Sequence, residues 1–288
     1  MALPEENREL GVPLARDLPS GCVYRYRPYD ATELRLLLAG GQLRFSNPHS
    51  FNDPWDCRPR IVAPISADPT EWKRVAHEVV QLFAGFRPDV SPESLDGFES
   101  HLGADAQALQ RALDSSADEI LPAIRGQYPV LCLSDSWDIP SMWAHYARAY
   151  RGVCLIFDAA ADPIIGGALQ VQYADELPEI ALLGTPPGAF VRKAVLTKHT
   201  HWAGEREYRA VARERKEGER DVDWNPTSEG GFVNVAPRAL LGIILGPLID
   251  PADAASARRL VASARHRIDI SRAELHRSKY ALIRKRES

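Results

Sequence analysis

The stretch Gly21–Ser46, "GCVYRYRPYDATELRLLLAGGQLRFS", decides the fold of this chain, because it predicts a strand, a helix and a second strand in succession. Aromatic and β-branched residues open it, and Pro28 closes that first run, as in a short strand. Asp30 can cap a helix whose leucines recur at helical spacing, and Gly40 and Gly41 end it. The closing "QLRFS" has the composition of another strand. The stretch therefore favours an α+β fold.

The rest of the chain adds strands around a separate helical segment. Apolar residues at helical spacing over about 69–126 predict an inserted helical segment that packs outside the sheet and contributes few groups to a site. Residues 1–20 are polar and rich in proline, so we expect a flexible leader. Residues 21–288 then form a single α+β domain. Further strands are predicted over residues 128–136, 151–158, 231–247 and 278–285.

Composition limits the function classes. The chain has 288 residues, 45% of them apolar and 26% charged, which is ordinary for a globular protein. A formal net charge of -4 gives no global attraction to nucleic acid or to an anionic membrane, so any nucleic-acid contact must come from a local patch. No apolar run approaches the roughly 20 residues of a membrane span, and the acidic N-terminus has no apolar core. We expect a cytoplasmic protein that does not contact membranes, whereas its oligomeric state is open.

The cysteines and the search for common motifs indicate no particular reaction. Cys22, Cys57, Cys132 and Cys154 are scattered with no CxxC pair, which favours reduced, buried thiols over disulfides or metal ligands. The phosphate-loop, dinucleotide-binding, zincin and serine-hydrolase signatures are absent from the sequence.

The sequence contains residues for two conceivable metal sites, and it favours neither. A zinc set lacks the paired local spacing that zinc sites usually have. A carboxylate set for a divalent cation competes with the simpler roles of turn capping for Asp53 and ion pairing for the others. We therefore predict no metal site. The zinc candidates are His145, His199, His201 and Cys132, and the carboxylate candidates are Asp53, Asp56, Glu205 and Glu207.

The run His201–Arg209, "HWAGEREYR", places carboxylates and guanidinium groups at alternating positions. If it is a strand, Glu205, Glu207 and Arg209 share one face, because side chains alternate. The run is then either a surface ion-pair ladder or the wall of a cleft. Two neighbouring carboxylates repel, so one should have a raised pKa unless Arg209 or another guanidinium neutralises the pair.

Aromatic residues mark two further places. The first strand alternates Tyr24 and Tyr26 with arginines, so large polar groups lie on both of its faces. A predicted buried strand ends at Ser134, and the following helix carries Trp143 and Tyr146 one turn apart. Such aromatics are usually core, although a flat ring beside a hydroxyl also receives planar ligands.

These landmarks together resemble a bacterial family, domain of unknown function 2971. The blocks are "YRYRPYD", "QLRFSNPHSFNDPWDC", "CLSDSWDIPSMWAHYARAYRGVCLIFD" and "KHTHWAGEREYRAV", and the resemblance spans residues 22 to 283 in order. The family name implies no activity.

A more distant resemblance is to ADP-ribosyltransferase-like folds, and it implies a central mixed or split β-sheet and NAD as the cofactor. It rests on the order of the Y-R-Y strand, leucine helix and "LRFS" strand, and on the Glu-x-Glu spacing of "EREYRAV". The first-strand His-x-Thr and the Ser-Thr-Ser motif of those enzymes are missing. By position, the resemblance implies cofactor anchoring by Arg25 or Tyr26, support by Ser134, nicotinamide stacking by Trp143 or Tyr146, and catalysis by Glu207 with Glu205.

The resulting hypothesis is an NAD-dependent ADP-ribosyltransferase that cleaves the nicotinamide–ribose bond. A carboxylate is suited to that reaction because it stabilises the positive charge that develops on the ribose. The acceptor would be a protein or a nucleic acid, and the setting a conflict between bacteria and phage. Two alternatives stay open, a non-catalytic nucleotide- or peptide-binding module and a metal-dependent nuclease.

The hypothesis makes a demanding structural prediction. Tyr24 or Tyr26, Ser134, Trp143 and Glu207 lie far apart in the sequence but should converge on one cleft. In the loop "SFNDPWD", we expect Asn52 and Asp53 to bond mainly to the local backbone.

Overall fold

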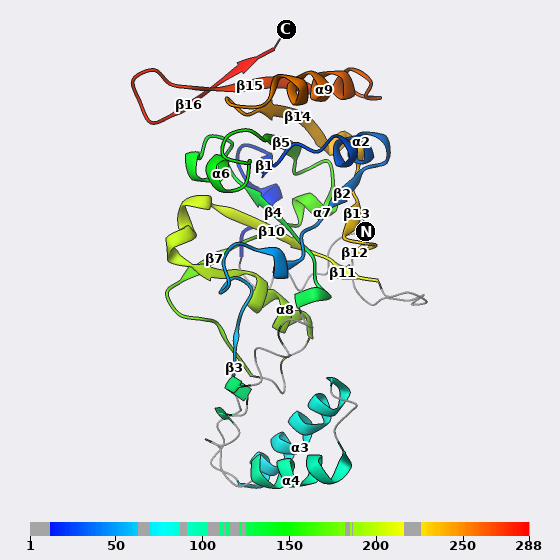
Figure 1. Cartoon of the computed structure of the whole chain (residues 1–288), viewed down its shortest axis with the longest axis vertical. Helices are drawn as coiled ribbons and strands as arrows, with labels where there is room; N and C mark the ends of the chain where they lie inside the picture. Colours follow the sequence, from blue (N-terminus) through cyan, green and yellow to red (C-terminus); the bar gives the residue numbers. More distant parts are fainter. Residues whose placement is uncertain are drawn as a thin grey trace.

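The computed structural model describes residues 12–62, 69–86, 91–102, 125–181, 187–215 and 226–287, with residue 185 and a few positions between 107 and 121. Figure 1 shows the chain with its β-sheet in the upper part and two helices at the lower end.

Eight strands of the described chain form one mixed sheet, in the order β16-β15-β14-β5-β1-β4-β10-β6. Within this sheet β14 and β15 run parallel, and the other neighbours are antiparallel. The large mixed sheet with separate helices confirms the α+β class. The strands are β1 Cys22–Arg27, β4 Val130–Ser134, β5 Val153–Asp158, β6 Leu169–Gln170, β10 Glu207–Val211, β14 Leu240–Leu245, β15 Asp269–Leu275 and β16 Leu282–Arg286.

Four short strand pairs surround the main sheet in the described residues. They are β2 Gln42–Arg44 with β13 Phe232–Asn234, β3 Arg60–Val62 with β8 Glu179–Ala181, β7 Gln172–Ala174 with β9 Thr197–His199, and β11 Arg213–Glu214 with β12 Thr227–Ser228.

The described helices are mostly short. The α-helices are α2 Ala31–Gly40, α3 Pro69–Phe86, α4 Pro92–Leu102, α6 Pro140–His145, α7 Pro163–Gly166, α8 Pro187–Val195 and α9 Pro251–Ala262. The 3-10 helices are η1 Ala15–Asp17, η2 Pro48–Ser50, η3 Thr200–Glu205 and η4 Pro237–Ala239.

The opening unit β1–α2–β2 forms as the sequence predicts. The Asp30 carboxylate accepts hydrogen bonds from the backbone N–H groups of Thr32 and Glu33, at 2.8 and 2.9 Å, which caps α2. Gly41 ends the helix with φ of 74°, and a Cβ there would lie 2.0 Å from the carbonyl oxygen of Val235. Only glycine fits that position.

The two faces of the sheet carry different cores. Leucines of α2 and alanines of α9 pack with Val23, Leu133 and Leu155 on one face. On the other, Trp143 of α6 packs with Tyr26 of β1 and with neighbouring residues of β5 and β14. The alternation along β1 thus separates Val23 and Arg25 from Tyr24 and Tyr26, as expected for a strand.

The sheet is split between β1 and β4. In the described chain, β4 meets β1 at one residue pair, Tyr24 with Ser134, whereas β1 pairs with β5 over six residue pairs and β4 with β10 over five. Beyond Tyr24 the two strands separate. Ser46 follows β2 and exchanges two backbone hydrogen bonds of 2.8 Å with Val130 at the far end of β4. The opening is therefore bounded at both ends.

The leader expected over residues 1–20 contacts the fold in its second half. Leu14 pairs with Leu169 of β6, and Ala15 is fully buried in the core. Residues 1–11 lie outside the described residues.

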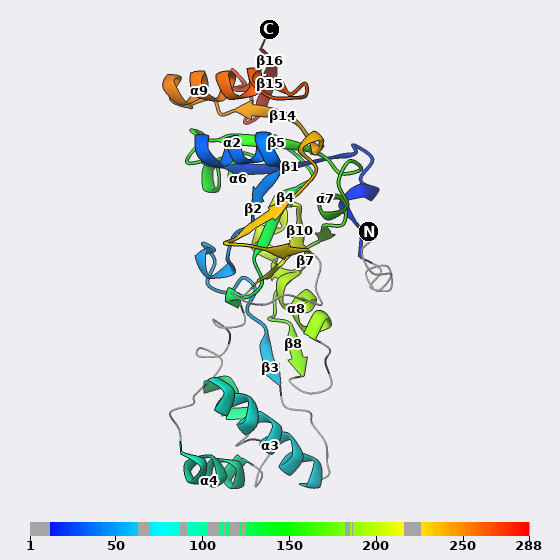
Figure 2. The same cartoon turned by 90° about the vertical axis from the view of Figure 1, so that its right-hand side faces the viewer.

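The inserted helices α3 and α4 lie apart from the main sheet in both views (Figures 1 and 2). Parts of the segment 69–126 lie outside the described residues. At its end, the Arg125 guanidinium donates to the carbonyl oxygens of Cys57, at 3.0 Å, and Asp56.

Two further findings concern the whole described chain. Its helices are all too short or too polar to cross a membrane. The four cysteines are free thiols, as predicted; Cys57 and Cys154 are buried as well, whereas Cys22 and Cys132 are only partly buried.

Candidate functional site

A cavity of about 430 Å³ lies at the split between β1 and β4. Such a volume falls in the range of small-molecule sites, about 300 to 1,000 Å³. Its lining comes from β1, α2, β2 and β4, from α6 and the residue after it, from the segment 46–56, and from β9, η3 and β10. The residues that matter most for chemistry are Arg25, Tyr26, Tyr146, Lys198, Glu205 and Glu207.

The two glutamates reach the cavity differently from the prediction. The strand β10 begins at Glu207, whereas Glu205 ends the 3-10 helix η3, so the run is not the continuous strand that the alternation of charges allowed. Arg206 between them adopts a left-handed conformation, with φ of 49° and ψ of 54°. This turn still brings both carboxylates to one ammonium group, since Lys198 Nζ lies 2.5 Å from Glu205 Oε2 and 3.0 Å from Glu207 Oε2.

Arg209 completes a buried network of three carboxylates and two cations. Its guanidinium donates to both oxygens of Glu207, at 2.8 and 2.9 Å, and to both oxygens of Asp56, at 2.7 and 2.6 Å. Lys198 Nζ lies 3.6 Å from Asp56 as well. Each of the five side chains is at most 4% exposed. Charges this deep are tolerated only because they are paired.

The pKa values of the two glutamates are shifted in opposite directions. Burial alone would raise the pKa of Glu207, but the Arg209 guanidinium and the Lys198 ammonium outweigh it and lower that pKa to about 2. Burial raises the pKa of Glu205, and Glu207 adds to that rise, although Lys198 opposes it. Glu207 therefore stays ionised, whereas Glu205 accepts a proton more readily than an ordinary glutamate.

Neighbouring hydroxyl groups hold the glutamates in position. Tyr146 Oη donates to Glu205 Oε1 at 2.8 Å, and Ser134 Oγ donates to the backbone carbonyl of Glu205, also at 2.8 Å. The backbone N–H of Glu207 donates to Tyr173 Oη at 2.9 Å. Ser134 is fully buried behind the cavity, so its contact fixes the turn that carries Glu205.

Another wall of the cavity carries arginines. Arg25 is 8% exposed, and its Nη1 has no hydrogen-bond partner among the described residues. Burial, followed by the nearby charge of Arg27, lowers the pKa of Arg25 to about 9. A buried guanidinium with an unfilled donor is costly unless a ligand supplies an acceptor.

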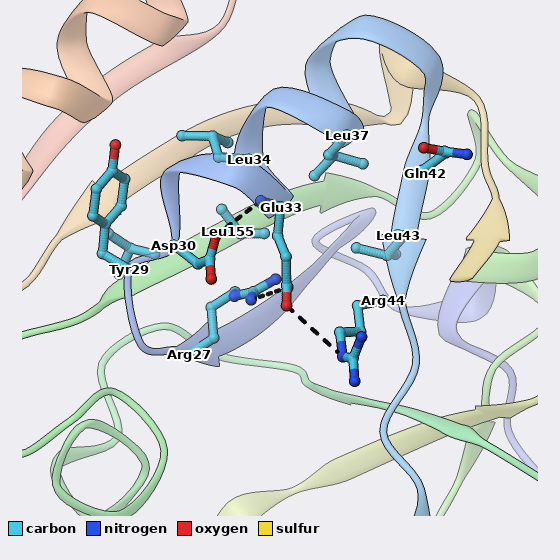
Figure 3. A pocket seen from close by; sticks show the side chains of 11 residues that line it. Arg27, Tyr29, Asp30, Glu33, Leu34, Leu37, Gln42, Leu43, Arg44 and Leu155 are labelled. Atoms are coloured by element: carbon cyan, nitrogen blue, oxygen red, sulfur yellow. Dashed lines mark hydrogen bonds and ion pairs between the residues drawn. The ribbon is translucent and has the colours of Figure 1, made fainter. Parts of the chain in front are cut away.

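Two further arginines lie at the rim of this wall. Figure 3 shows Arg27 and Arg44 both directed at the carboxylate of Glu33, which sits between them; Arg44 Nε is 3.8 Å from its nearer oxygen, and Arg27 bonds to it directly. The rim thus has one more cation than carboxylate.

The aromatic residues divide between core and cavity. Tyr26 lines the cavity and is fixed by its Oη, which donates to the Ser136 carbonyl at 2.9 Å and accepts from the Ile139 N–H at 3.2 Å. Trp143 is fully buried, lies edge-on to Tyr26 at 5.3 Å and donates to the Trp137 carbonyl at 2.8 Å. The nicotinamide stacking suggested for Trp143 does not fit this packing.

The predicted convergence is therefore partial. Tyr26 and Glu207 both line the cavity. Tyr146, the residue after α6, lines it as well. Ser134 and Trp143 lie immediately behind it. Sequence reasoning missed Lys198, because a single lysine in a polar stretch carries no signal that it is buried.

The loop before the network behaves partly as expected. Asp53 accepts from the Trp55 backbone N–H at 2.9 Å, as predicted, and also from Trp202 Nε1 at 2.7 Å. Asn52 instead lines the cavity, with its Oδ1 3.5 Å from Tyr146 Oη.

The carboxylates of the site are occupied by cations of the chain itself. Among the described residues, no three histidine, cysteine or acidic side chains are grouped to hold a metal ion. Arg209 and Lys198 take the positions that a divalent cation would need.

Comparison with known proteins gives no match: no family model, no curated protein and no solved structure matches this chain. Both resemblances drawn from the sequence therefore remain predictions.

Proposed function

We propose that this chain binds NAD in the cavity between β1 and β4 and cleaves the nicotinamide–ribose bond, as ADP-ribosyltransferases do. One observation carries the proposal. A single cavity combines a buried arginine that has an unfilled donor, Arg25, with a carboxylate that stays ionised, Glu207.

The arginine wall suits the diphosphate of a dinucleotide. Guanidinium groups bind phosphate oxygens through paired hydrogen bonds, and Arg25 has Nη1 available for one. Arg27 and Arg44 add positive charge at the rim. A bound phosphate would also relieve the cost of burying Arg25.

The glutamate wall suits bond cleavage. As the C–N bond breaks, nicotinamide leaves with the electron pair and the ribose becomes positively charged, which the ionised Glu207 stabilises. An acceptor nucleophile then bonds to the ribose carbon, and its proton passes to Glu205, whose pKa is raised by burial. Tyr146 offers a ring for the planar nicotinamide.

A second function is favoured by another observation. Both oxygens of Glu207 already accept hydrogen bonds from Arg209, and one also contacts Lys198. If that network only supports the fold, the cavity is a nucleotide-binding module without catalysis.

Nicotinamide release from labelled NAD separates the two functions. We expect the natural protein to release nicotinamide, Glu207→Gln to lower the rate at least about 100-fold, and Glu205→Gln to lower it less. Glu179→Gln, which changes an exposed carboxylate on β8, is the matched control and should leave the rate unchanged. Circular dichroism at the assay temperature verifies that each variant is folded.

Two outcomes overturn the proposal. Equal nicotinamide release by the natural protein and a folded Glu207→Gln variant removes the catalytic role. Binding of NAD without release leaves the binding module as the function.

A further inference from the structure

The C-terminal region has a charge opposite to that of the rest of the chain. Residues 251–287 hold ten Lys and Arg against four Asp and Glu, a formal net charge of +6 in a chain of net charge -4. This region forms α9 and the hairpin of β15 and β16, at the end of the molecule farthest from α3 and α4 (Figure 1).

Three of the four carboxylates of this region are already paired with cations of the region. Glu287 pairs with Arg258 at 2.7 Å, Glu274 with Lys285 at 2.6 Å, and Asp269 with Arg286 at 3.4 Å. At the tip, Arg277 and Lys279 are exposed, and neither has a carboxylate partner among the described residues. Their charges are available to a ligand.

A cavity of about 500 Å³ lies beside this tip. Tyr150, Leu275 and Tyr280 give it apolar and aromatic surface, and Arg277 and Lys279 give it positive charge. None of the described residues that line it carries a carboxylate. Tyr280 is as exposed as an isolated residue, at 107%, so its ring has no packing role in the fold.

The backbone that presents Tyr150 is strained. Arg148, Ala149 and Tyr150 have φ angles of 48°, 51° and 66°, three successive left-handed residues without a glycine. Hydrogen bonds hold the conformation, because Tyr150 N–H donates to the Trp143 carbonyl at 3.0 Å and Leu248 N–H donates to the Tyr150 carbonyl at 3.1 Å. Such strain persists only when its surroundings enforce it, and it concentrates at binding sites.

We propose that this cavity and the hairpin tip bind single-stranded nucleic acid, with one base stacked on Tyr280 and the flanking phosphates on Arg277 and Lys279. Exposed aromatic rings among cations are the recognition surface that single strands use, because every base has a flat face and every linkage a negative charge. A duplex hides its bases, so it would lose the stacking contact. The proposal stands without NAD cleavage.

The position of the surface relates it to the first cavity. Pro140 at the start of α6 lines the hairpin cavity, and Tyr146 just after the end of α6 lines the cavity of the glutamates. A strand bound at the hairpin would therefore lie one short helix away from the proposed NAD site.

Fluorescence anisotropy with labelled 12-nucleotide single strands, DNA and RNA in separate arms, tests the proposal at 50 and 200 mM salt. We expect binding by the full chain that weakens with salt, and a duplex of the same sequence to bind at least about tenfold more weakly. Tyr280→Ala should weaken single-strand binding at least about fivefold, and Arg277→Ala with Lys279→Ala should reduce the dependence on salt.

Matched controls separate the patch from general surface effects. Trp55→Ala removes an aromatic that is 63% exposed outside the patch, and Arg35→Ala removes an exposed cation on α2; neither should change the affinity. Strand binding is measured without NAD, so failure of NAD cleavage and failure of this proposal are distinguishable. The proposal is overturned if neither the DNA nor the RNA single strand binds, or if the duplex binds as tightly as the single strand. Normal single-strand binding by Tyr280→Ala would overturn it as well.

Discussion

Replacing Glu207 by Gln tests how much the charge of Glu207 in the buried network contributes to the free energy of unfolding. The structure lowers the pKa of Glu207 from its ordinary value of 4.5 to about 2. At about 1.4 kcal/mol for each pH unit, the ionised form is favoured in the folded state by about 3 kcal/mol. The side chain is 2% exposed, so solvent does not screen this interaction. We therefore expect Glu207→Gln to lower the free energy of unfolding at pH 7 by about 2 to 4 kcal/mol.

The dependence on pH has a definite sign. A carboxylate with a lowered folded-state pKa contributes its full stabilisation above the unfolded value near 4.5 and loses it as pH falls towards 2. Glu205 acts in the opposite direction, because its pKa is raised, but it is present in both proteins. The difference in stability between the natural protein and Glu207→Gln should therefore shrink as pH falls from about 5 to 2.

Urea unfolding followed by circular dichroism at several pH values measures that difference. Glu179→Gln changes an exposed carboxylate that pairs with Arg60 at 2.7 Å, and should cost only about 0 to 1 kcal/mol. Equal stability of Glu207→Gln and the natural protein at pH 7, with parallel curves down to pH 2, would refute the reasoning.

Three further substitutions test other parts of the structure. Arg25→Met removes a buried cation with an unfilled donor, so we expect the melting temperature without ligand to rise and the stabilisation by ADP-ribose to disappear in a thermal-shift assay. Tyr26→Phe should cost about 1 kcal/mol in urea unfolding, because the partly buried N–H of Ile139 loses its acceptor. Gly41→Ala should cost at least about 2 kcal/mol in the same assay, because it combines a left-handed φ with a clash at the Val235 carbonyl; Gly40→Ala, where a Cβ meets nothing, is its control.

Local signals in the sequence predicted the local structure well. Asp30, the leucine spacing and Gly41 fixed the opening helix, because each acts through contacts with its own neighbours. The class of fold follows from the order of such units. The split of the sheet could not be predicted this way, because it depends on where β4 stops pairing with β1, more than 100 residues away.

The candidate site shows the same limit. The alternation of "EREYR" identified Glu205, Glu207 and Arg209 as a group, although a left-handed Arg206 and not a continuous strand brings them together. Asp56 completes the network from a segment 153 residues away from Arg209, and Lys198 joins it from β9, nine residues before Glu207; no spacing rule connects either to β10. For Trp143 the sequence suggested a possible ligand contact, but the side chain is fully buried in the core.

Binding of ADP-ribose measured by isothermal titration calorimetry tests most directly whether the cavity is a dinucleotide site. We expect the natural protein and Arg35→Met to bind ADP-ribose, whereas Arg25→Met, which removes the buried guanidinium from the cavity wall, should bind at least about tenfold more weakly. The absence of binding by the natural protein, or equal binding by Arg25→Met, would contradict this expectation.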